Sequence, residues 1–241
     1  GAQWFGYRVR RCPVVYVCLE GEAGLSVRLK AYCERSGSIP EGVDFINQAV
    51  NLLDAKDLRD LVSAVQARYA GGGIVVIDTL NRAAPGMDEN SSAEMGRVIA
   101  AATVIQQAVG GLVLFVHHTG KDTSRGGRGS NALEGGATCE IEVAGSRSTT
   151  VVTFRKVKDG EEGPPIVLER VAVGRSLVLV PGTQSVMTSG AMDTLNALRR
   201  IEVPGGVASG ACEIPSSRRT PGSQKVCVAP ASFPWNSCRL P

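Results

Sequence analysis

The sequence contains few of the residues from which metal centres and disulfide frameworks are built. It has only two histidines, His117 and His118, and its seven cysteines include no C-x-x-C pair. An odd number of scattered cysteines indicates neither a zinc site nor a disulfide framework. Several of these cysteines lie within apolar runs, as is typical of small core residues in a reducing cytosol.

Charge and long hydrophobic runs are also limited. The net charge of +3 is too small to indicate nucleic-acid binding by itself. No apolar run is long enough to span a bilayer, and no signal peptide is recognised, so we expect a cytoplasmic protein without a membrane partner. The chain has 241 residues, of which 43% are hydrophobic, and it can therefore bury one α/β core and carry a tail.

The most informative stretch covers residues 73–80 (GIVVIDTL), where four consecutive β-branched residues end in Asp78. Unbroken apolar runs are typical of parallel strands that are covered on both faces. In open α/β sheets, ligands bind outside the carboxyl ends of the strands. Asp78 is therefore a candidate ligand for a nucleotide-bound Mg²⁺, held directly or through water. The alternative is an ordinary aspartate that caps the following turn.

Other candidate side chains follow in the same pattern. One apolar run stops at Glu20, and another stops at His117 and His118. Arg128 comes shortly afterwards, between two glycines that leave the backbone free to present it. Phosphoryl transfer needs a group that orients water, a metal-holding carboxylate, a γ-phosphate contact and a cation for the transition state. Glutamate, aspartate, histidine and arginine match these four needs in that order, which is also their order along the chain.

The segments VVYVCLEGEAG, GIVVIDTLNR, VLFVHHTGK and GRGSNAL together resemble the RecA-like ATPases of the plasmid RepA helicase type, with relatives in phages and mobile elements. The resemblance covers about the first two thirds of the chain. It implies that Glu20 activates water, that Asp78 is the Walker B aspartate, and that His118, with His117 as the alternative, senses the γ-phosphate. It further implies that Arg128 is an arginine finger that reaches a neighbouring subunit. The implied cofactors are ATP and Mg²⁺, and the implied partners are a homo-hexamer or other ring and single-stranded DNA.

The sequence departs from that family in one respect. No G-x-x-x-x-G-K-[ST] phosphate loop is found, and Gly120-Lys121-Asp122 lacks both the glycine spacing and the hydroxyl after the lysine. We therefore expect a RecA-like P-loop NTPase core whose first strand and phosphate loop are missing. A chain truncated in this way is expected to be inactive, so whether it is an enzyme as it stands is left open.

Strands alternate with helical patterns, which predicts a mainly parallel sheet flanked by helices. Helices are expected over residues 25–35, over 57–69 after a possible N-cap at Asp54, and from Ser91 or Ser92 to Val109. A short strand is expected over 43–46, and a loop over 79–90.

Shorter β patterns over residues 139–143, 149–154 and 166–171 predict antiparallel strands added at one edge of the sheet. Lys156 and Lys158 follow the middle strand in a K-x-K-D-G segment that the family also has. The resemblance implies that they assist a neighbour's phosphates, and it places Thr79 and His117 with them among the cofactor-binding residues. The alternative is that each lysine only protects an edge strand.

We expect three regions along the chain: an ATPase core over 1–180, a linker with a short helix over 181–203, and a disordered tail over 204–241. The tail is rich in Gly, Ser, Pro and Arg and shows no hydrophobic period.

Two other functions stay open. The chain could be an inactive module that uses a RecA-like surface for assembly. It could also be a different doubly wound enzyme whose strand-end Asp and His residues bind a metal or act as acid and base.

Overall fold

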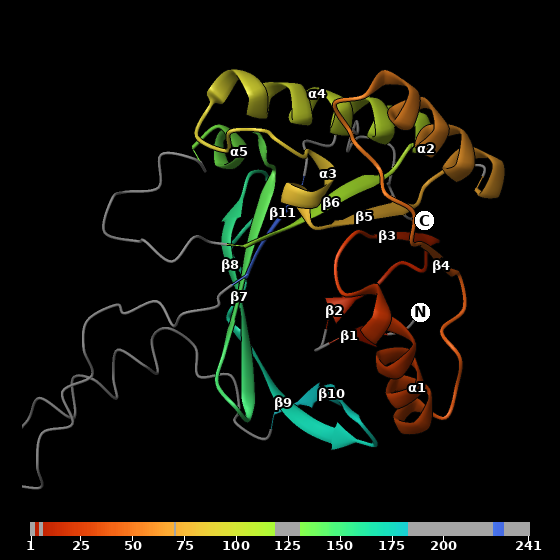
Figure 1. Ribbon diagram of the computed structural model, residues 1–241. Helices are drawn as coiled ribbons and strands as arrows, with labels where there is room; N and C mark the ends of the chain where they lie inside the picture. The colour runs from red at the N-terminus through yellow and green to blue at the C-terminus, as the bar shows by residue number, and fades with distance from the viewer. Residues whose placement is uncertain (1–2, 5–6, 70, 119–130, 183–223, 229–241) are drawn as a thin grey trace, which may run out of the picture.

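The computed structural model describes residues 3–4, 7–69, 71–118, 131–182 and 224–228. Within these ranges the chain forms one nine-stranded sheet and a separate two-stranded hairpin of β1 (Gln3–Trp4) and β2 (Tyr7–Arg8). The strand order in the large sheet is β10-β9-β8-β7-β11-β6-β5-β3-β4. Helices flank this sheet on both sides (Figure 1).

One half of the large sheet is parallel, as the apolar runs predict. Its members, from the edge inward, are β4 (Val43–Ile46), β3 (Val14–Cys18), β5 (Ile74–Asp78) and β6 (Leu112–His118).

The other half is antiparallel and extends further than expected. It contains β7 (Cys139–Gly145), β8 (Thr149–Val157), β9 (Ile166–Val173) and β10 (Ser176–Pro181). Among the described residues, three strand pairings of the large sheet are parallel and five are antiparallel. "Mainly parallel" therefore describes only the half that carries Asp78, and the antiparallel strands at the edge are confirmed.

The three helices expected between residues 25 and 109 are confirmed, and each begins or ends with the chemistry that its sequence indicates. The main helices are α1 (Leu25–Ser36), α2 (Ala55–Arg68) and α4 (Ser92–Val109). Asp54 caps α2 by accepting hydrogen bonds from the backbone N–H groups of Lys56 and Asp57, at 2.8 and 3.0 Å. Ser91 caps α4 in the same way, and α4 ends at Gly110, whose φ of 59° favours glycine.

Three short helical elements complete the described fold: the 3₁₀ turn η1 (Glu22–Gly24), α3 (Leu80–Ala83) and α5 (Asn131–Gly136). α3 lies where the sequence predicts a loop, because a single helical turn is too short to show a hydrophobic period.

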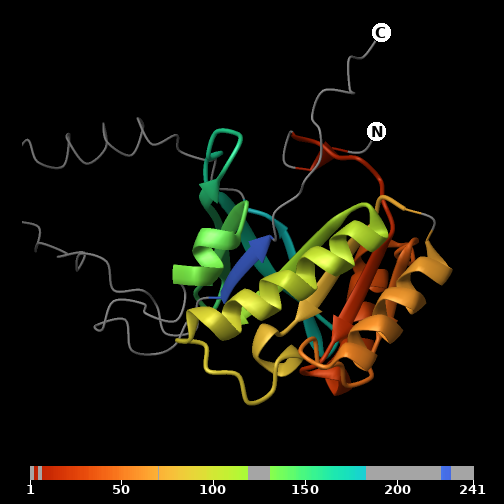
Figure 2. The same cartoon turned by 90° about the horizontal axis from the view of Figure 1, so that it is seen from above.

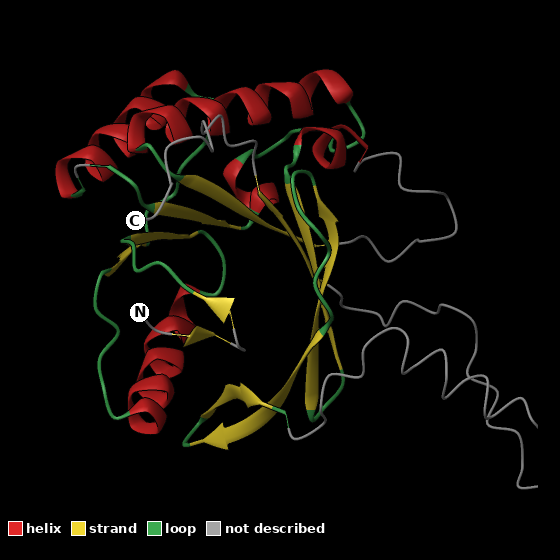
Figure 3. Ribbon diagram, turned by 180° about the vertical axis from the view of Figure 1, so that it is seen from behind, coloured by secondary structure: helices red, strands yellow, loops and turns green. Residues whose placement is uncertain are grey.

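The main core lies between the parallel strands and the pair α2 and α4, which run side by side over one face of the sheet (Figure 2). Alternate residues of β3, β5 and β6 are buried there: Val15, Val17, Val75, Ile77, Val113 and Phe115. Their neighbours on the opposite face, such as Val76 and Leu114, are only half-buried among the described residues. Figure 3 shows α1 on that opposite side, where the sheet curves around it and β9 and β10 contact it.

β11 (Gln224–Val228) corrects the expectation of a disordered tail at these five residues. It lies between β6 and β7 and pairs antiparallel with both. In the described part of the chain, β11 is therefore what connects the parallel half of the sheet to the antiparallel half. Its pairing depends on two open strand edges far away in sequence, which a local hydrophobic pattern does not reveal. The boundaries expected at 180 and 203 and the short helix of the linker lie at or outside the limits of the described residues.

Candidate functional site

Three strands bring their polar ends to the same edge of the sheet. Asp78, the last residue of β5, lies in register with Cys18 of β3 on one side and with Val116 of β6 on the other. Glu20 follows Cys18 by two residues, and His118 follows Val116 by two residues. Because these strands are parallel, the structure brings Glu20, Asp78 and His118 together at one carboxyl edge.

Asp78 is held by contacts to the neighbouring strand β3. The hydroxyl of Tyr16 donates a hydrogen bond to Oδ2 of Asp78. Tyr16 lies in register with Val76 of β5, and Asp78 follows Val76 by two residues. Because side chains alternate between faces along a strand, Tyr16 and Asp78 project from the same face of the sheet. The backbone N–H of Leu19 donates to the carbonyl oxygen of Asp78 at 2.6 Å. Asp78 is joined to Thr79 by a cis peptide bond.

Glu20 is held by Thr79, the residue that follows Asp78. Thr79 is 2% exposed, and its Oγ1 donates a hydrogen bond to Oε2 of Glu20 at 3.3 Å. Nε of Arg82, in α3, lies 4.0 Å from the same oxygen. Since about half of the Glu20 side chain and two thirds of the Arg82 side chain are exposed, this ion pair contributes little stability. The arrangement links the ends of β3 and β5 through a threonine hydroxyl and leaves the Glu20 carboxylate accessible to water.

The two histidines lie on opposite faces of β6. His117 is buried on the face that carries Val113 and Phe115, which pack under the helices. His118 is exposed and projects from the face that carries Asp78, because Asp78 and Val116 are in register. Of the two, His118 is the residue that shares a face with Asp78.

Lys156 and Lys158 are not brought to this edge. Lys156 lies in β8, and β6, β11 and β7 separate β8 from β5. At about 4.8 Å per strand, the two strands are roughly 19 Å apart. Nζ of Lys156 donates to the backbone carbonyl of Glu134 in α5 at 2.5 Å, and the backbone N–H of Lys158 donates to Thr138. Arg128 lies outside the described residues.

Sequence comparison assigns the chain to a family. The family model described as "AAA domain" matches residues 1–124, which is more than half of the 241 residues. The chain belongs to the AAA domain family. Among curated proteins, no sequence matches the chain significantly.

Solved structures similar to this AAA-family chain include two enzymes. The RadB recombinase is 18% identical, with a TM-score of 0.42 over 66% of this chain and 75% of that chain. An S-adenosylmethionine-dependent methyltransferase from Clostridium acetobutylicum ATCC 824 is 9% identical, with a TM-score of 0.23 over 90% of this chain and 83% of that chain. Both scores are below 0.5, so neither similarity supports an argument about this protein.

The oxygen donors at the edge suit one class of metal site. Among the described residues of the AAA-family chain, no group of three His, Cys, Asp or Glu side chains could hold a metal ion. Mg²⁺ at nucleotide sites needs fewer protein ligands, because one or two carboxylates are completed by phosphates and water. The carboxylates of Asp78 and Glu20 fit that kind of site, and they do not fit a metal centre built from protein ligands alone.

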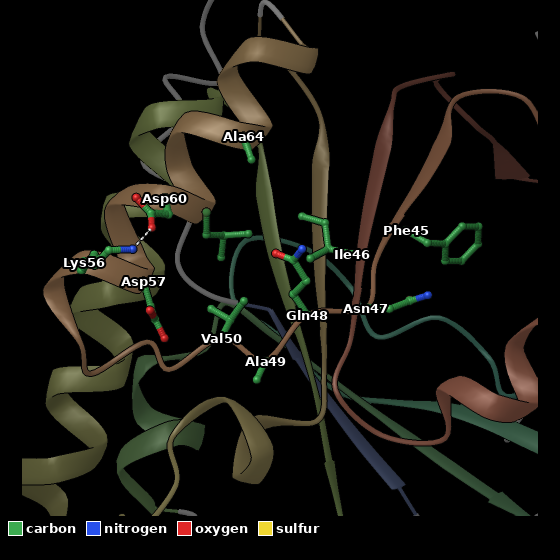
Figure 4. A pocket seen from close by; sticks show the side chains of 11 residues that line it. Phe45, Ile46, Asn47, Gln48, Ala49, Val50, Lys56, Asp57, Asp60 and Ala64 are labelled. Atoms are coloured by element: carbon green, nitrogen blue, oxygen red, sulfur yellow. Dashed lines mark hydrogen bonds and ion pairs between the residues drawn. The ribbon is translucent and has the colours of Figure 1, made fainter.

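A cavity of about 470 Å³ lies elsewhere in the AAA-family chain, between the end of β4 and the start of α2 (Figure 4). Neither Asp78 nor Glu20 lines it. Its charged lining residues already have partners: Nζ of Lys56 lies 2.6 Å from Asp60, and Asp57 accepts the backbone N–H of Asn51 at 2.9 Å. The strand-end cluster is therefore the better candidate site, because its carboxylates lie at the ends of adjacent parallel strands. No helix in the described ranges has the length and apolarity needed to cross a membrane.

Two residues of the site in this AAA-family chain were not predicted from the sequence. Tyr16 lies inside an apolar run, where an aromatic residue is normally interpreted as core, and Arg82 lies in the segment expected to be a loop. The only sequence signal for Tyr16 is its place on the strand that ends at Glu20, and the signal for Arg82 is its place four residues after Asp78.

The phenol of Tyr16 makes the stability of the AAA-family chain depend on alkaline pH. Burial first, and then the hydrogen bond to Asp78, raise the pKa of Tyr16 above its usual value of 10.0. The folded state thus holds this proton more tightly than the unfolded state, so the stability contributed by Tyr16 is complete below pH 10 and is lost as the pH rises toward the folded pKa.

We therefore expect Tyr16→Phe to reduce the loss of unfolding free energy between about pH 9 and pH 11. Urea denaturation of both proteins, followed by circular dichroism across this range, measures the two slopes. Equal slopes would contradict the expectation. Tyr69, whose pKa is raised chiefly by its hydrogen bond to Asp44, contributes in the same direction to both proteins and cancels in the comparison.

Proposed function

We propose that this chain is the core of a RecA-like ATPase of the plasmid RepA helicase type, which acts on DNA during replication of a plasmid, phage or mobile element. Membership of the AAA domain family supports a nucleotide-dependent role. The observation that carries the proposal is the meeting of Asp78 and Glu20 at adjacent strand ends, linked through Thr79. Two carboxylates at the carboxyl edge of a parallel sheet suit metal-assisted phosphoryl transfer.

In this proposal each residue has one task. Asp78 holds Mg²⁺ directly or through water, and Thr79 keeps the Glu20 carboxylate in place beside it. Glu20 accepts a proton from the attacking water and orients it. His118, which shares a face with Asp78, contacts the γ-phosphate, and the buried His117 is the less suitable of the two. The bound Mg²⁺ neutralises charge that develops on the phosphate oxygens.

The proposed assembly is a ring, usually a hexamer, that binds single-stranded DNA in the cytoplasm. Arg128 reaches the site of the neighbouring subunit, and Lys156 and Lys158 assist there. The separation of Lys156 from Asp78, roughly four strand spacings or 19 Å within one chain, is compatible with an action across a subunit boundary.

The phosphate cradle is the part of the ATPase that this sequence lacks, since it contains no G-x-x-x-x-G-K-[ST] segment. Backbone N–H groups of such a loop bind the β- and γ-phosphates, and its lysine neutralises them. In this proposal ATP hydrolysis needs such a loop, and the 241 residues without one are inactive.

For the chain as it stands, we expect very weak ATP binding and negligible turnover even with Mg²⁺. The reason is the loss of the main phosphate contacts. Calorimetry or titration with a fluorescent ATP analogue measures the affinity. Micromolar binding to this chain would mean that another segment supplies the cradle, and the roles given to Asp78 and Glu20 would have to be reassigned.

The activity itself is tested on a longer form that carries a phosphate loop before Gly1. Phosphate release that depends on Mg²⁺ and is lost in Asp78→Asn supports the proposal. A longer form that binds ATP but never hydrolyses it favours the second candidate, an inactive RecA-like module for assembly or partner binding. The observation that favours this second candidate is the absence of a G-x-x-x-x-G-K-[ST] segment from the sequence.

A further inference from the structure

The carboxylate of Asp78 has one side-chain donor in the described part of the chain, the hydroxyl of Tyr16. The two residues are 62 positions apart in sequence and are brought together by the register of β3 and β5. The bond occupies Oδ2 of Asp78. No other side chain among the described residues donates to this carboxylate, so Tyr16 supplies the side-chain hydrogen bond that orients it.

The ring of Tyr16 is itself held in place. Its centroid lies 5.9 Å from that of Phe45, and the two ring planes are tilted by 48°. Phe45 belongs to the neighbouring strand β4, in register with Tyr16. A tilted aromatic pair at this distance is a favourable arrangement. The contact with Phe45 of β4 thus helps to hold the Tyr16 ring in the position from which its hydroxyl bonds to Asp78.

We propose that Tyr16 is a positioning residue that orients the carboxylate of Asp78 for a divalent cation. This inference rests on the proposed function, because it takes Asp78 as the cation ligand. A hydrogen-bond donor behind a ligating carboxylate fixes its orientation, and removal of such a partner typically weakens metal binding by about 10- to 100-fold. Because the hydrogen bond from Tyr16 takes one of the lone pairs of Oδ2, Oδ1 of Asp78 keeps the greater capacity for the cation.

Mn²⁺ is the probe for the test, since carboxylate sites that accept Mg²⁺ also accept Mn²⁺ and its free form is measured by electron paramagnetic resonance. The full 241-residue chain is titrated with Mn²⁺ up to millimolar concentrations, because two carboxylates and water hold the ion weakly when no phosphates are present. The parent is compared with Tyr16→Phe, which removes the hydroxyl and keeps the ring against Phe45. We expect Tyr16→Phe to weaken Mn²⁺ binding about tenfold, with an unchanged far-ultraviolet circular dichroism spectrum.

The matched control is Tyr69→Phe. Tyr69 also donates its hydroxyl to an aspartate, Asp44 in β4, so this variant removes the same kind of hydrogen bond away from the site. Its Mn²⁺ affinity should equal that of the parent. A general loss of stability would affect both tyrosine variants, whereas a positioning role affects only Tyr16→Phe.

A second variant, Phe45→Leu, keeps the hydroxyl and removes the ring that supports it, and it should weaken Mn²⁺ binding by a smaller factor. If the parent binds Mn²⁺ through Asp78, as loss of binding in Asp78→Asn would establish, and both Tyr16→Phe and Phe45→Leu bind like the parent, the positioning role is overturned and the proposed function stands. If the parent binds no Mn²⁺, or binds it equally in Asp78→Asn, the metal role of Asp78 fails and the inference is overturned with it.

Discussion

Replacement of Arg128 by alanine is expected to lower ATP turnover by about three to five orders of magnitude, in a form of the protein that carries a phosphate loop. The guanidinium would stabilise charge that develops on the transferring phosphoryl group, which a ground-state ligand does not carry. Nucleotide binding and ring assembly should therefore stay nearly intact. Steady-state phosphate release, nucleotide titration and size-exclusion chromatography measure the three quantities.

Mixed rings show whether Arg128 acts on the neighbouring subunit. Arg128→Ala is combined with Asp78→Asn, and each variant alone should be inactive. Some interfaces of the mixed ring then combine an intact Asp78 with an intact Arg128, so partial activity should return. Normal hydrolysis by Arg128→Ala, or mixed rings as inactive as either parent, would leave Arg128 as a surface arginine.

Glu20→Gln should lower turnover by about two to four orders of magnitude in the same form, as expected for the loss of a general base. Glutamine has nearly the same shape, and its carbonyl oxygen can still accept the hydrogen bond from Thr79. The site should therefore keep its geometry and bind nucleotide normally while losing the proton acceptor. Single-turnover hydrolysis and an independent nucleotide titration separate the two effects.

Glu22→Gln is the matched control for this prediction. Glu22 is exposed in η1, two residues beyond Glu20, and the same charge is removed there without touching Thr79. Its turnover should be that of the parent. Equal losses in the two variants would mean that the charge of this segment matters rather than a base at Glu20.

The strand ends were predictable because they depend on local patterns. The apolar runs before Glu20, Asp78 and His118 set both the strands and the edge at which the side chains emerge. The capping roles of Asp54 and Ser91 were equally predictable, since a capping residue is recognised from the few residues around it.

The contacts between strands were not predictable in the same way. The hydrogen bond from Tyr16 to Asp78 requires the register of two strands, and apolar runs without alternation do not specify register. The approach of Arg82 to Glu20 requires α3, which is a single turn. The half-covered face that includes Val76 also departs from the burial on both faces that the apolar runs predict.

The central place of β11 has a consequence for synthesis on the ribosome. β6 and β7 are made first, and β11, which pairs with both, follows far later in the chain. At about 5–20 residues per second, roughly 5 to 20 seconds of translation separate His118 from its partner Gln224. During that interval β6 and β7 each present an open edge to other nascent chains. A chain that ends before residue 224 should therefore give a larger fraction of insoluble product than a chain that ends after residue 228.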